Sequence, residues 1–296
     1  MIKLGLIGYP VSHSLSPKIQ NAALEACGLE GDYSLFPILP HDMQGLQALL
    51  ARVRSGEITG LNVTIPHKQS VIPLLDELTP TAHAIGAVNV IYLRKNQLIG
   101  DNTDAAGFLS DVGRFLTTAP VRDDKTRRHG DLNALVLGAG GSARAVVYAL
   151  VKSGWKVTVA ARRIEQAQEL AESFANDELR ISSFCEAFLS DESSIFQPSE
   201  LQLLVNTTPL GMAPNIDQSP LPQNSSIPSG TAVYDLVYNP RETKLVKDAR
   251  AHGLQATTGL GMLIEQAVLG FQLWTGYKPP RAILRAAVDV EPISNL

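Results

Sequence analysis

The feature that most constrains the fold is a glycine-rich loop in the middle of the chain, Gly138-Ala139-Gly140-Gly141-Ser142-Ala143. It follows an apolar stretch typical of a buried strand, Ala134–Leu137, and precedes a predicted helix, Arg144–Lys152. The first glycine allows a sharp turn, the second lets the backbone approach a pyrophosphate, and Ala143 allows close helix packing. The phosphates would bind free N–H groups at the helix N-terminus. The segment therefore predicts a Rossmann-type dinucleotide-binding domain.

The residues after the next predicted strand indicate which dinucleotide binds. That strand, Lys156–Ala160, is followed by Ala161, Arg162 and Arg163, with no acidic residue at its tip. NAD sites usually carry Asp or Glu there, which binds the ribose hydroxyls and would repel a 2′-phosphate. Guanidinium groups donate paired hydrogen bonds to phosphate. Arg162 and Arg163 therefore favour NADP over NAD; the alternative interpretation is a solvated helix start.

Strand-like and helix-like stretches alternate along the first part of the chain. Strands are predicted at 3–7, 33–38, 61–65 and 88–93, and helices at 17–28, 43–53, 71–78 and 108–116. Pro17 is expected at the start of its helix, with Ser16 as the N-cap. This alternation is typical of βαβ units, so we expect an α/β fold with a mainly parallel sheet.

The alternation resumes at Ala134, after a polar stretch from Thr117 to Asp131 that is typical of a solvated loop. Beyond the elements already named, helices are predicted at 165–174 and 262–274, and strands at 203–206 and 232–235. We predict two α/β domains. Residues 1–104, completed by helices within 262–296, form a discontinuous first domain, and residues 105–261 form the Rossmann-type domain.

The charge of the chain argues against several classes of partner. The net charge is −4, from 25 basic and 29 acidic residues, which gives no general attraction to nucleic acid or to an anionic membrane. No apolar run approaches the ~18 residues of a membrane-spanning helix. Cys27 and Cys185 lie far apart and have no partner at metal-ligand spacing. We therefore expect a small-molecule substrate, no metal, no disulfide and a cytoplasmic location.

Four short polar clusters border predicted strands of the first domain. They are Ser12–Pro17, Asn62–Lys68, Gly86–Asn89 and Gly100–Asp104. Ligand crevices in open α/β sheets form beyond the carboxyl ends of strands. Hydroxyl and amide side chains there can bind a polyhydroxylated substrate, while one Lys and one Asp can supply proton transfer and orientation.

Together with the glycine loop, these clusters resemble the shikimate dehydrogenase family essentially from end to end. Three further segments carry the resemblance: Val205–Met212, Tyr234–Pro240 and Gly259–Ala267. Each segment alone is weakly specific, but their common order makes the combination specific. The resemblance implies reversible, NADPH-dependent reduction of 3-dehydroshikimate to shikimate in the biosynthesis of chorismate and aromatic amino acids. The expected assembly is a monomer or a homodimer.

The resemblance also implies roles for single residues. Lys68 and Asp104 match the catalytic pair; the Lys68 ammonium would stabilise the alkoxide formed by hydride transfer and donate its proton, while Asp104 would hold Lys68. The matched substrate-binding residues are Ser14 and Ser16 for the carboxylate, Thr64, Asn89 and Gln266 for ring hydroxyls, and Tyr238 at the same pocket. The matched cofactor residues are Gly138, Ala139, Gly140, Gly141, Ser142, Ala143, Arg162, Arg163, Thr207, Leu236 and Gly259.

Some alternatives stay open. The family's usual Asn-Arg-Thr after the second nucleotide strand is Ala161-Arg162-Arg163 here, which removes an adenosine-side hydrogen bond and either strengthens phosphate binding or broadens cofactor choice. The nearest rival enzyme is a quinate/shikimate dehydrogenase with relaxed NAD/NADP use, and a rival of another class is a non-catalytic ligand sensor. Taken singly, Lys68 could be a surface lysine and Asp104 a helix N-cap.

Overall fold

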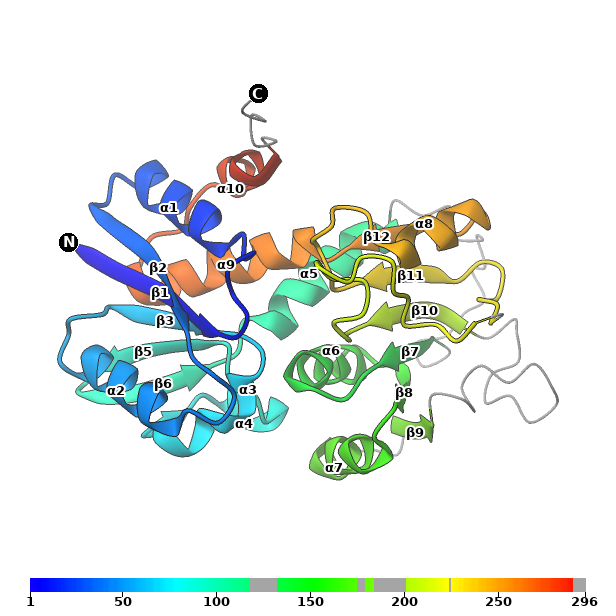
Figure 1. Cartoon of the computed structure of the whole chain (residues 1–296), viewed down its shortest axis with the longest axis horizontal. Helices are drawn as coiled ribbons and strands as arrows, with labels where there is room; N and C mark the ends of the chain where they lie inside the picture. Colours follow the sequence, from blue (N-terminus) through cyan, green and yellow to red (C-terminus); the bar gives the residue numbers. More distant parts are fainter. Residues whose placement is uncertain (118–131, 175–178, 184–200, 224, 290–296) are drawn as a thin grey trace. The chain divides into compact units, whose positions relative to one another are not determined.

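The structure, a computed structural model, describes residues 1–117, 132–174, 179–183, 201–223 and 225–289 (Figure 1). The chain divides into two compact units, Met1–Gly107 with Leu263–Leu296, and Phe108–Met262. Both boundaries fall inside helices, α5 (Asp104–Thr117) and α9 (Leu260–Thr275). Cys185 and nearly all of the predicted loop, residues 118–131, lie outside the described residues.

The first unit is built on a six-stranded sheet with the order β2-β1-β3-β5-β6-β4. Its strands are β1 (Ile2–Gly8), β2 (Gly31–Pro37), β3 (Gly60–Val63), β4 (Glu77–Leu78), β5 (Val90–Arg94) and β6 (Gln97–Asp101). Strand β1 runs parallel to β2 and β3, and β4 runs parallel to β6, whereas β5 is antiparallel to both of its neighbours. The α/β class with mainly parallel sheets, predicted from the sequence, is confirmed.

Helices cover this sheet because their apolar residues recur at helical spacing. They are α1 (Ser16–Ala26), α2 (Met43–Arg54), α3 (His67–Ser70), α4 (Pro80–Ile85), α9 and α10 (Arg281–Asp289). Helix α2 buries Leu46, Leu49, Leu50 and Val53 in a core shared with the sheet residues Leu61, Val63 and Ile91. Helices α1 and α10 lie side by side (Figure 1).

Two local predictions in this unit are wrong. The helix predicted at 71–78 is a short 3-10 turn (Ile72–Leu74) followed by β4, because Leu75 is extended and the residues of β4 pair with β6. Ser16 is not an N-cap; it is the first residue of α1, and its N–H donates to Ser14 Oγ (3.2 Å). The β5–β6 hairpin was not predicted from the sequence, although its turn residues Lys95 and Asn96 both have the positive φ typical of hairpin turns.

The second unit holds a six-stranded, fully parallel sheet with the order β12-β11-β10-β7-β8-β9. Its strands are β7 (Asn133–Leu137), β8 (Lys156–Ala161), β9 (Leu179–Ser183), β10 (Leu201–Asn206), β11 (Ala232–Asp235) and β12 (Ala256–Thr258). The strand order reverses between β7 and β10, the kind of switch point where ligands bind in open α/β sheets. The predicted Rossmann-type fold is therefore confirmed.

The helices of the second unit are α6 (Gly141–Lys152), α7 (Ile164–Phe174) and α8 (Lys244–Ala251). Helices α6 and α7 lie side by side, with the rings of Tyr148 and Phe174 6.3 Å apart (Figure 1). Helix α8 packs on β11 and β12, and its buried residues share a core cluster with Leu135 and Leu137 of β7. Among the residues that the structure describes, no helix combines the length and apolar character needed to cross a membrane.

Candidate active site

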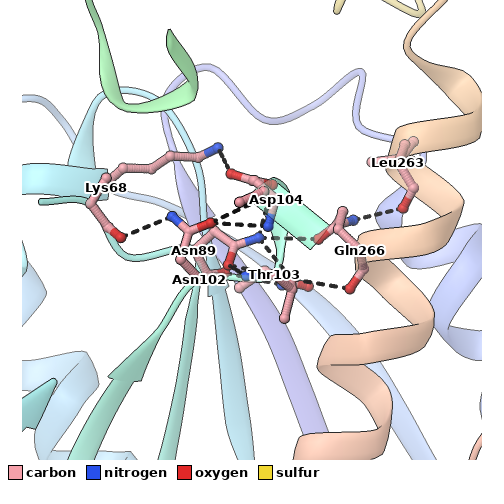
Figure 2. A network of polar contacts seen from close by, with 10 residues as sticks. Lys68, Asn89, Asn102, Thr103, Asp104, Leu263 and Gln266 are labelled. Atoms are coloured by element: carbon pink, nitrogen blue, oxygen red, sulfur yellow. Dashed lines mark hydrogen bonds and ion pairs between the residues drawn. The ribbon is translucent and has the colours of Figure 1, made fainter. Parts of the chain in front are cut away.

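A buried ion pair lies at the carboxyl end of the first unit's sheet. Lys68 is on α3, just after β3, and its Nζ lies 2.5 Å from Asp104 Oδ2 at the start of α5. The two side chains are only 10% and 7% exposed. The N–H of Val88, just before β5, donates to the Lys68 carbonyl (2.7 Å), which holds the backbone of Lys68 in place. Figure 2 shows the Lys68 ammonium reaching to Asp104.

Asn102 caps the start of α5, so the Asp104 side chain is not needed as the cap and can contact Lys68 instead. Its Oδ1 accepts the N–H groups of Asp104 (3.0 Å) and Ala105 (3.4 Å), and its Nδ2 donates to the Ala87 carbonyl (2.9 Å). Asn102 therefore takes the capping role that the sequence allowed for Asp104. The carboxylate of Asp104 is left to accept hydrogen bonds from side chains of the site.

Asn89 connects the ion pair to α9. Its Nδ2 lies within hydrogen-bonding distance of Asp104 Oδ1 (2.9 Å), Thr103 Oγ1 (3.0 Å) and Gln266 Oε1 (3.3 Å). Its Oδ1 accepts the N–H of Thr103 (2.8 Å), and Gln266 Nε2 donates to the Leu263 carbonyl (2.7 Å). The structure thus joins Lys68, Asn89, Asp104 and Gln266, four of the predicted site residues, in one network (Figure 2).

This network keeps two opposite charges buried next to each other. Burial strengthens the attraction between Lys68 and Asp104, but removing one partner would leave an uncompensated buried charge. Asp104 accepts from both Lys68 and Asn89, so its orientation is fixed. An ammonium held in this way can stabilise a developing oxyanion and donate a proton to it.

The other predicted substrate residues lie at two places. Thr64 follows β3, where its N–H donates to the Ile7 carbonyl of β1 (2.8 Å). Ser14 and Ser16 lie in the segment that leads from β1 into α1, and Ser16 is buried. Tyr238 follows β11 and belongs to the second unit. Ser14 and Ser16 therefore lie at the start of α1 and Thr64 at the end of β3, all in the first unit, whereas Tyr238 belongs to the second unit.

The glycine loop in the second unit forms a tight turn at the end of β7. Gly138 has a φ of +108°, and a Cβ atom there would lie 2.7 Å from Thr207 Oγ1. Thr207 in turn donates through Oγ1 to the Leu137 carbonyl (2.7 Å). Gly140 is the N-cap of α6, and Ala143 is fully buried. The turn leaves the N-terminus of α6 directly beyond the end of β7.

The remaining predicted cofactor residues follow other strands of the same sheet. Leu236 follows β11 and donates its N–H to the Asn206 carbonyl (2.9 Å). A Cβ atom at Gly259, after β12, would lie 2.4 Å from the Leu236 carbonyl oxygen. Arg162 and Arg163 are exposed between β8 and α7. All these positions lie beyond the carboxyl ends of parallel strands, where a dinucleotide fits.

Asp235, the last residue of β11, is a buried carboxylate that was not predicted from the sequence. Asp235 accepts hydrogen bonds from Asn206 Nδ2 (2.8 Å), the Val237 N–H (3.0 Å) and Thr243 Oγ1 (2.6 Å). Burial raises the pKa of Asp235 to about 6, although these donors act in the opposite direction. Asp235 and Asn206 lie in the segments quoted for the family resemblance, which was the available signal. Among the described residues, no group of three or more His, Cys, Asp or Glu side chains could hold a metal ion.

The fold and this site define a dinucleotide-dependent α/β oxidoreductase. Comparison with family models gives the finer identity. Residues 6–91 match the shikimate dehydrogenase substrate binding domain, residues 122–192 match shikimate / quinate 5-dehydrogenase, and residues 259–288 match the shikimate 5'-dehydrogenase C-terminal domain.

Known proteins match over almost the whole chain. The shikimate dehydrogenase (NADP(+)) of Salinibacter ruber is 42% identical over 97% of this chain and 96% of its own length. That of Symbiobacterium thermophilum is 38% identical over 96% and 92%. A crystal structure of shikimate 5-dehydrogenase from Thermus thermophilus with NADP(H) and shikimate is 37% identical, with a TM-score of 0.79 over 97% of this chain and 98% of that one. The chain belongs to the shikimate dehydrogenase family.

Proposed function

We propose that this protein is a shikimate dehydrogenase, which reversibly reduces 3-dehydroshikimate to shikimate with NADPH. The reaction belongs to the biosynthesis of chorismate and aromatic amino acids. The observation that carries the proposal is the buried Lys68–Asp104 pair, with Nζ and Oδ2 2.5 Å apart. A non-catalytic ligand sensor has no need for such a pair, because binding alone requires no proton donor.

The chemistry follows from the charge that develops on the substrate. Bound NADPH supplies the hydride, and the C3 ketone oxygen becomes an alkoxide as it is reduced. The Lys68 ammonium stabilises this charge and donates a proton to the oxygen, while Asp104 holds the ammonium in place. In the oxidation of shikimate the same Lys68 accepts the hydroxyl proton. Asp104 also accepts a hydrogen bond from the substrate hydroxyl.

The polar network supports the assignment of the substrate ring to the first unit. Asn89 and Gln266 bind ring hydroxyls, since both amides already belong to the network around Asp104. Thr64 contributes a further hydroxyl at the end of β3. Ser14 and Ser16 bind the substrate carboxylate through hydroxyl donors at the start of α1. Tyr238 serves the same substrate from the segment after β11.

The residues of the second unit fit NADP. The turn formed by Gly138, Ala139, Gly140, Gly141, Ser142 and Ala143 holds the pyrophosphate on the N-terminus of α6. Arg162 and Arg163 hold the 2′-phosphate, since both are exposed and no acid precedes them on β8. Thr207, which donates to the Leu137 carbonyl, would also contact the cofactor, and Leu236 and Gly259 would lie near its nicotinamide. A cytoplasmic location and a monomeric or homodimeric assembly stay predictions from the sequence.

An absorbance assay at the nicotinamide band tests the proposal. Shikimate and quinate are each offered with NADP and with NAD, and kcat/KM is measured for the four pairs. We expect shikimate with NADP to give the highest value. A higher value for quinate or for NAD would favour the quinate/shikimate alternative, and no turnover with any pair would contradict the proposed activity.

A further inference from the structure

The neighbouring strands β10 and β11 end in two buried polar residues that contact each other. Asn206 and Asp235 are partners in the parallel register, and Asn206 Nδ2 donates to Asp235 Oδ1 (2.8 Å). The other carboxylate oxygen, Oδ2, accepts from Thr243 Oγ1 at the start of α8 (2.6 Å). All three residues are fully buried. None of them has a role in the substrate or cofactor contacts proposed for this chain.

The Asn206 side chain holds the segment that follows β10. Its Oδ1 accepts the backbone N–H (3.0 Å) and the hydroxyl (2.7 Å) of Thr208. Thr207 lies between these two residues and donates its N–H (2.9 Å) and its hydroxyl (2.7 Å) to the Leu137 carbonyl of β7. Hydrogen bonds therefore fix the backbone around Thr207, one of the proposed cofactor residues.

Asp235 holds the segment that follows β11. Its Oδ1 accepts the N–H of Val237 (3.0 Å), while the Leu236 N–H donates to the Asn206 carbonyl (2.9 Å). Gly259 packs against the Leu236 backbone so closely that a Cβ atom at position 259 would collide with it. Leu236 and Gly259 are the residues proposed to lie near the nicotinamide, and the conformation of both depends on the contacts of Asp235 and Asn206.

A carboxylate suits the position of Asp235 because donors from three segments converge on it. An ionised carboxylate only accepts hydrogen bonds, so one side chain satisfies all three donors. Burial raises the pKa of Asp235 to about 6, so the charged form costs free energy inside the fold. Hydrogen bonds from Thr243, Val237 and Asn206 act in the opposite direction. Side chains that contact a ligand need such support, since they must be held within about 0.5 Å of the productive geometry.

We propose that Asp235 is a positioning residue for hydride transfer: through Asn206 and Val237 it holds the segments after β10 and β11 in the conformation that orients the nicotinamide ring. The inference rests on the proposed use of NADPH. Asp235 itself touches neither the substrate nor the cofactor. Its loss should therefore slow the hydride step and leave the binding of the adenosine part of NADP, which Arg162 and Arg163 hold, unchanged.

The test compares two substitutions at this position. Asp235→Ala removes the acceptor for all three donors. Asp235→Asn keeps an oxygen for Asn206 and Val237, and its amide group can donate to the Thr243 hydroxyl in place of the bond to Oδ2. The amide variant should therefore restore most of the function that the alanine variant loses.

Thr231→Val is the matched control. Thr231 immediately precedes β11, is also buried, and donates through Oγ1 to the carbonyl of Leu201, the first residue of β10 (3.0 Å). This variant loses a buried hydrogen bond between the same two strands, but at their amino ends. It should keep the kcat of the wild type, because it leaves the segments after both strands in place.

The readouts are kcat for 3-dehydroshikimate, the primary isotope effect with NADPH deuterated at the transferred position, and calorimetric titration with 2′,5′-ADP, which lacks the nicotinamide. Asp235→Ala should lower kcat roughly tenfold to a hundredfold, the size expected for a misplaced reactant. It should also raise the isotope effect on kcat, because the hydride step then limits turnover. Its affinity for 2′,5′-ADP should stay within about twofold of the wild type.

Unchanged kcat and isotope effect in Asp235→Ala would overturn the proposal, and so would an equal loss of kcat in Thr231→Val. If Asp235→Ala does not fold, Thr243→Val and Thr243→Ser replace it, since valine removes the donor to Oδ2 and serine keeps it. Thr243→Val should then lower kcat and raise the isotope effect while Thr243→Ser changes neither, and equal behaviour of the two would overturn the proposal. A wild-type protein without turnover would instead contradict the proposed function.

Discussion

Lys68 and Asp104 are buried charges that depend on each other. Each loses its hydration in the fold, and each regains a partner through the 2.5 Å contact between Nζ and Oδ2. The second oxygen of Asp104 is held by Asn89, which prevents the carboxylate from turning away from the ammonium. This arrangement explains how the fold keeps an ionisable pair in its interior.

Replacing Lys68 with alanine should remove the proton donor while leaving the other substrate contacts in place. We expect kcat to fall by about 10²–10⁴-fold, and the shikimate dissociation constant to change by only a modest factor. Steady-state kinetics and calorimetric titration with shikimate measure the two effects. Lys18→Ala, at an exposed position of α1, is the control and should behave as the wild type. Near-normal turnover in Lys68→Ala would exclude Lys68 from the mechanism.

Asp235 should make stability depend on pH. Its pKa in the fold is raised to about 6, whereas an unfolded Asp titrates near its usual value of about 3.9. Between these values the folded state holds a proton that the unfolded state has lost, so the free energy of unfolding decreases as pH rises from about 4 to 6. The full effect of this one group is on the order of 3 kcal/mol.

Urea unfolding of the wild type and of Asp235→Asn at pH 4 and pH 7 isolates this contribution. Asparagine is close to the same size and does not titrate, and all other groups are shared by the two proteins. We expect the wild type to lose stability relative to the variant as the pH rises. A stability difference that is the same at both pH values would show that Asp235 does not titrate in this window.

At the scale of elements, the turn from β7 into α6 contains two glycines, Gly138 and Gly140, that are needed for different reasons. Gly138 needs its positive φ of +108° and has Thr207 in the space that a Cβ would fill. Gly140 has an ordinary φ of −81°, and no described atom lies within 4 Å of its Cβ position. The fold therefore requires glycine at position 138, while at position 140 the open space is suited to an approaching phosphate.

Alanine at each position should separate the effect on stability from the effect on NADP binding. Gly138→Ala should lower the melting temperature by several degrees, because the strained backbone costs about 1–3 kcal/mol. Gly140→Ala should keep the wild-type melting temperature and raise the NADP dissociation constant. Calorimetry on the ligand-free proteins and NADP titration measure both effects. Equal NADP affinity in the wild type and Gly140→Ala would contradict the assignment of this turn to the pyrophosphate.

At the scale of the whole molecule, the two units should respond to different ligands. In hydrogen exchange measured by mass spectrometry, shikimate alone should slow exchange around Lys68, Asn89 and the start of α5. NADP alone should slow it in the turn between β7 and α6 and after β8. The ligand-free protein is the reference, and a distant element such as α2 should not change. NADP protection confined to the first unit would contradict the division of binding roles.

The sequence predicted some elements well because their signals are local. The strand, glycine turn and helix around Gly138 need only neighbouring residues to be recognised, and so does the amphipathic helix α2. The predicted helix at 71–78 failed because its last residues, Glu77 and Leu78, pair with β6, which is a contact that the local sequence does not reveal. Strand β6 was missed because the short sequence Gln97–Asp101 becomes a strand by pairing with β5, which is a contact between segments.

The candidate site also has features that local sequence predicts and features that depend on contacts between distant segments. From the sequence alone came the α/β class, the dinucleotide loop, the arginines after β8, and the residues Lys68, Asn89, Asp104 and Gln266 as site candidates. Only the tertiary structure decided that Asn102 caps α5, that Asn89 bridges Asp104 and Gln266, and that Asp235 is buried. Local conformation and backbone chemistry depend on residues close in sequence. Burial and hydrogen-bond partners depend on segments as far apart as Asn89 and Gln266, which only the folded chain brings together.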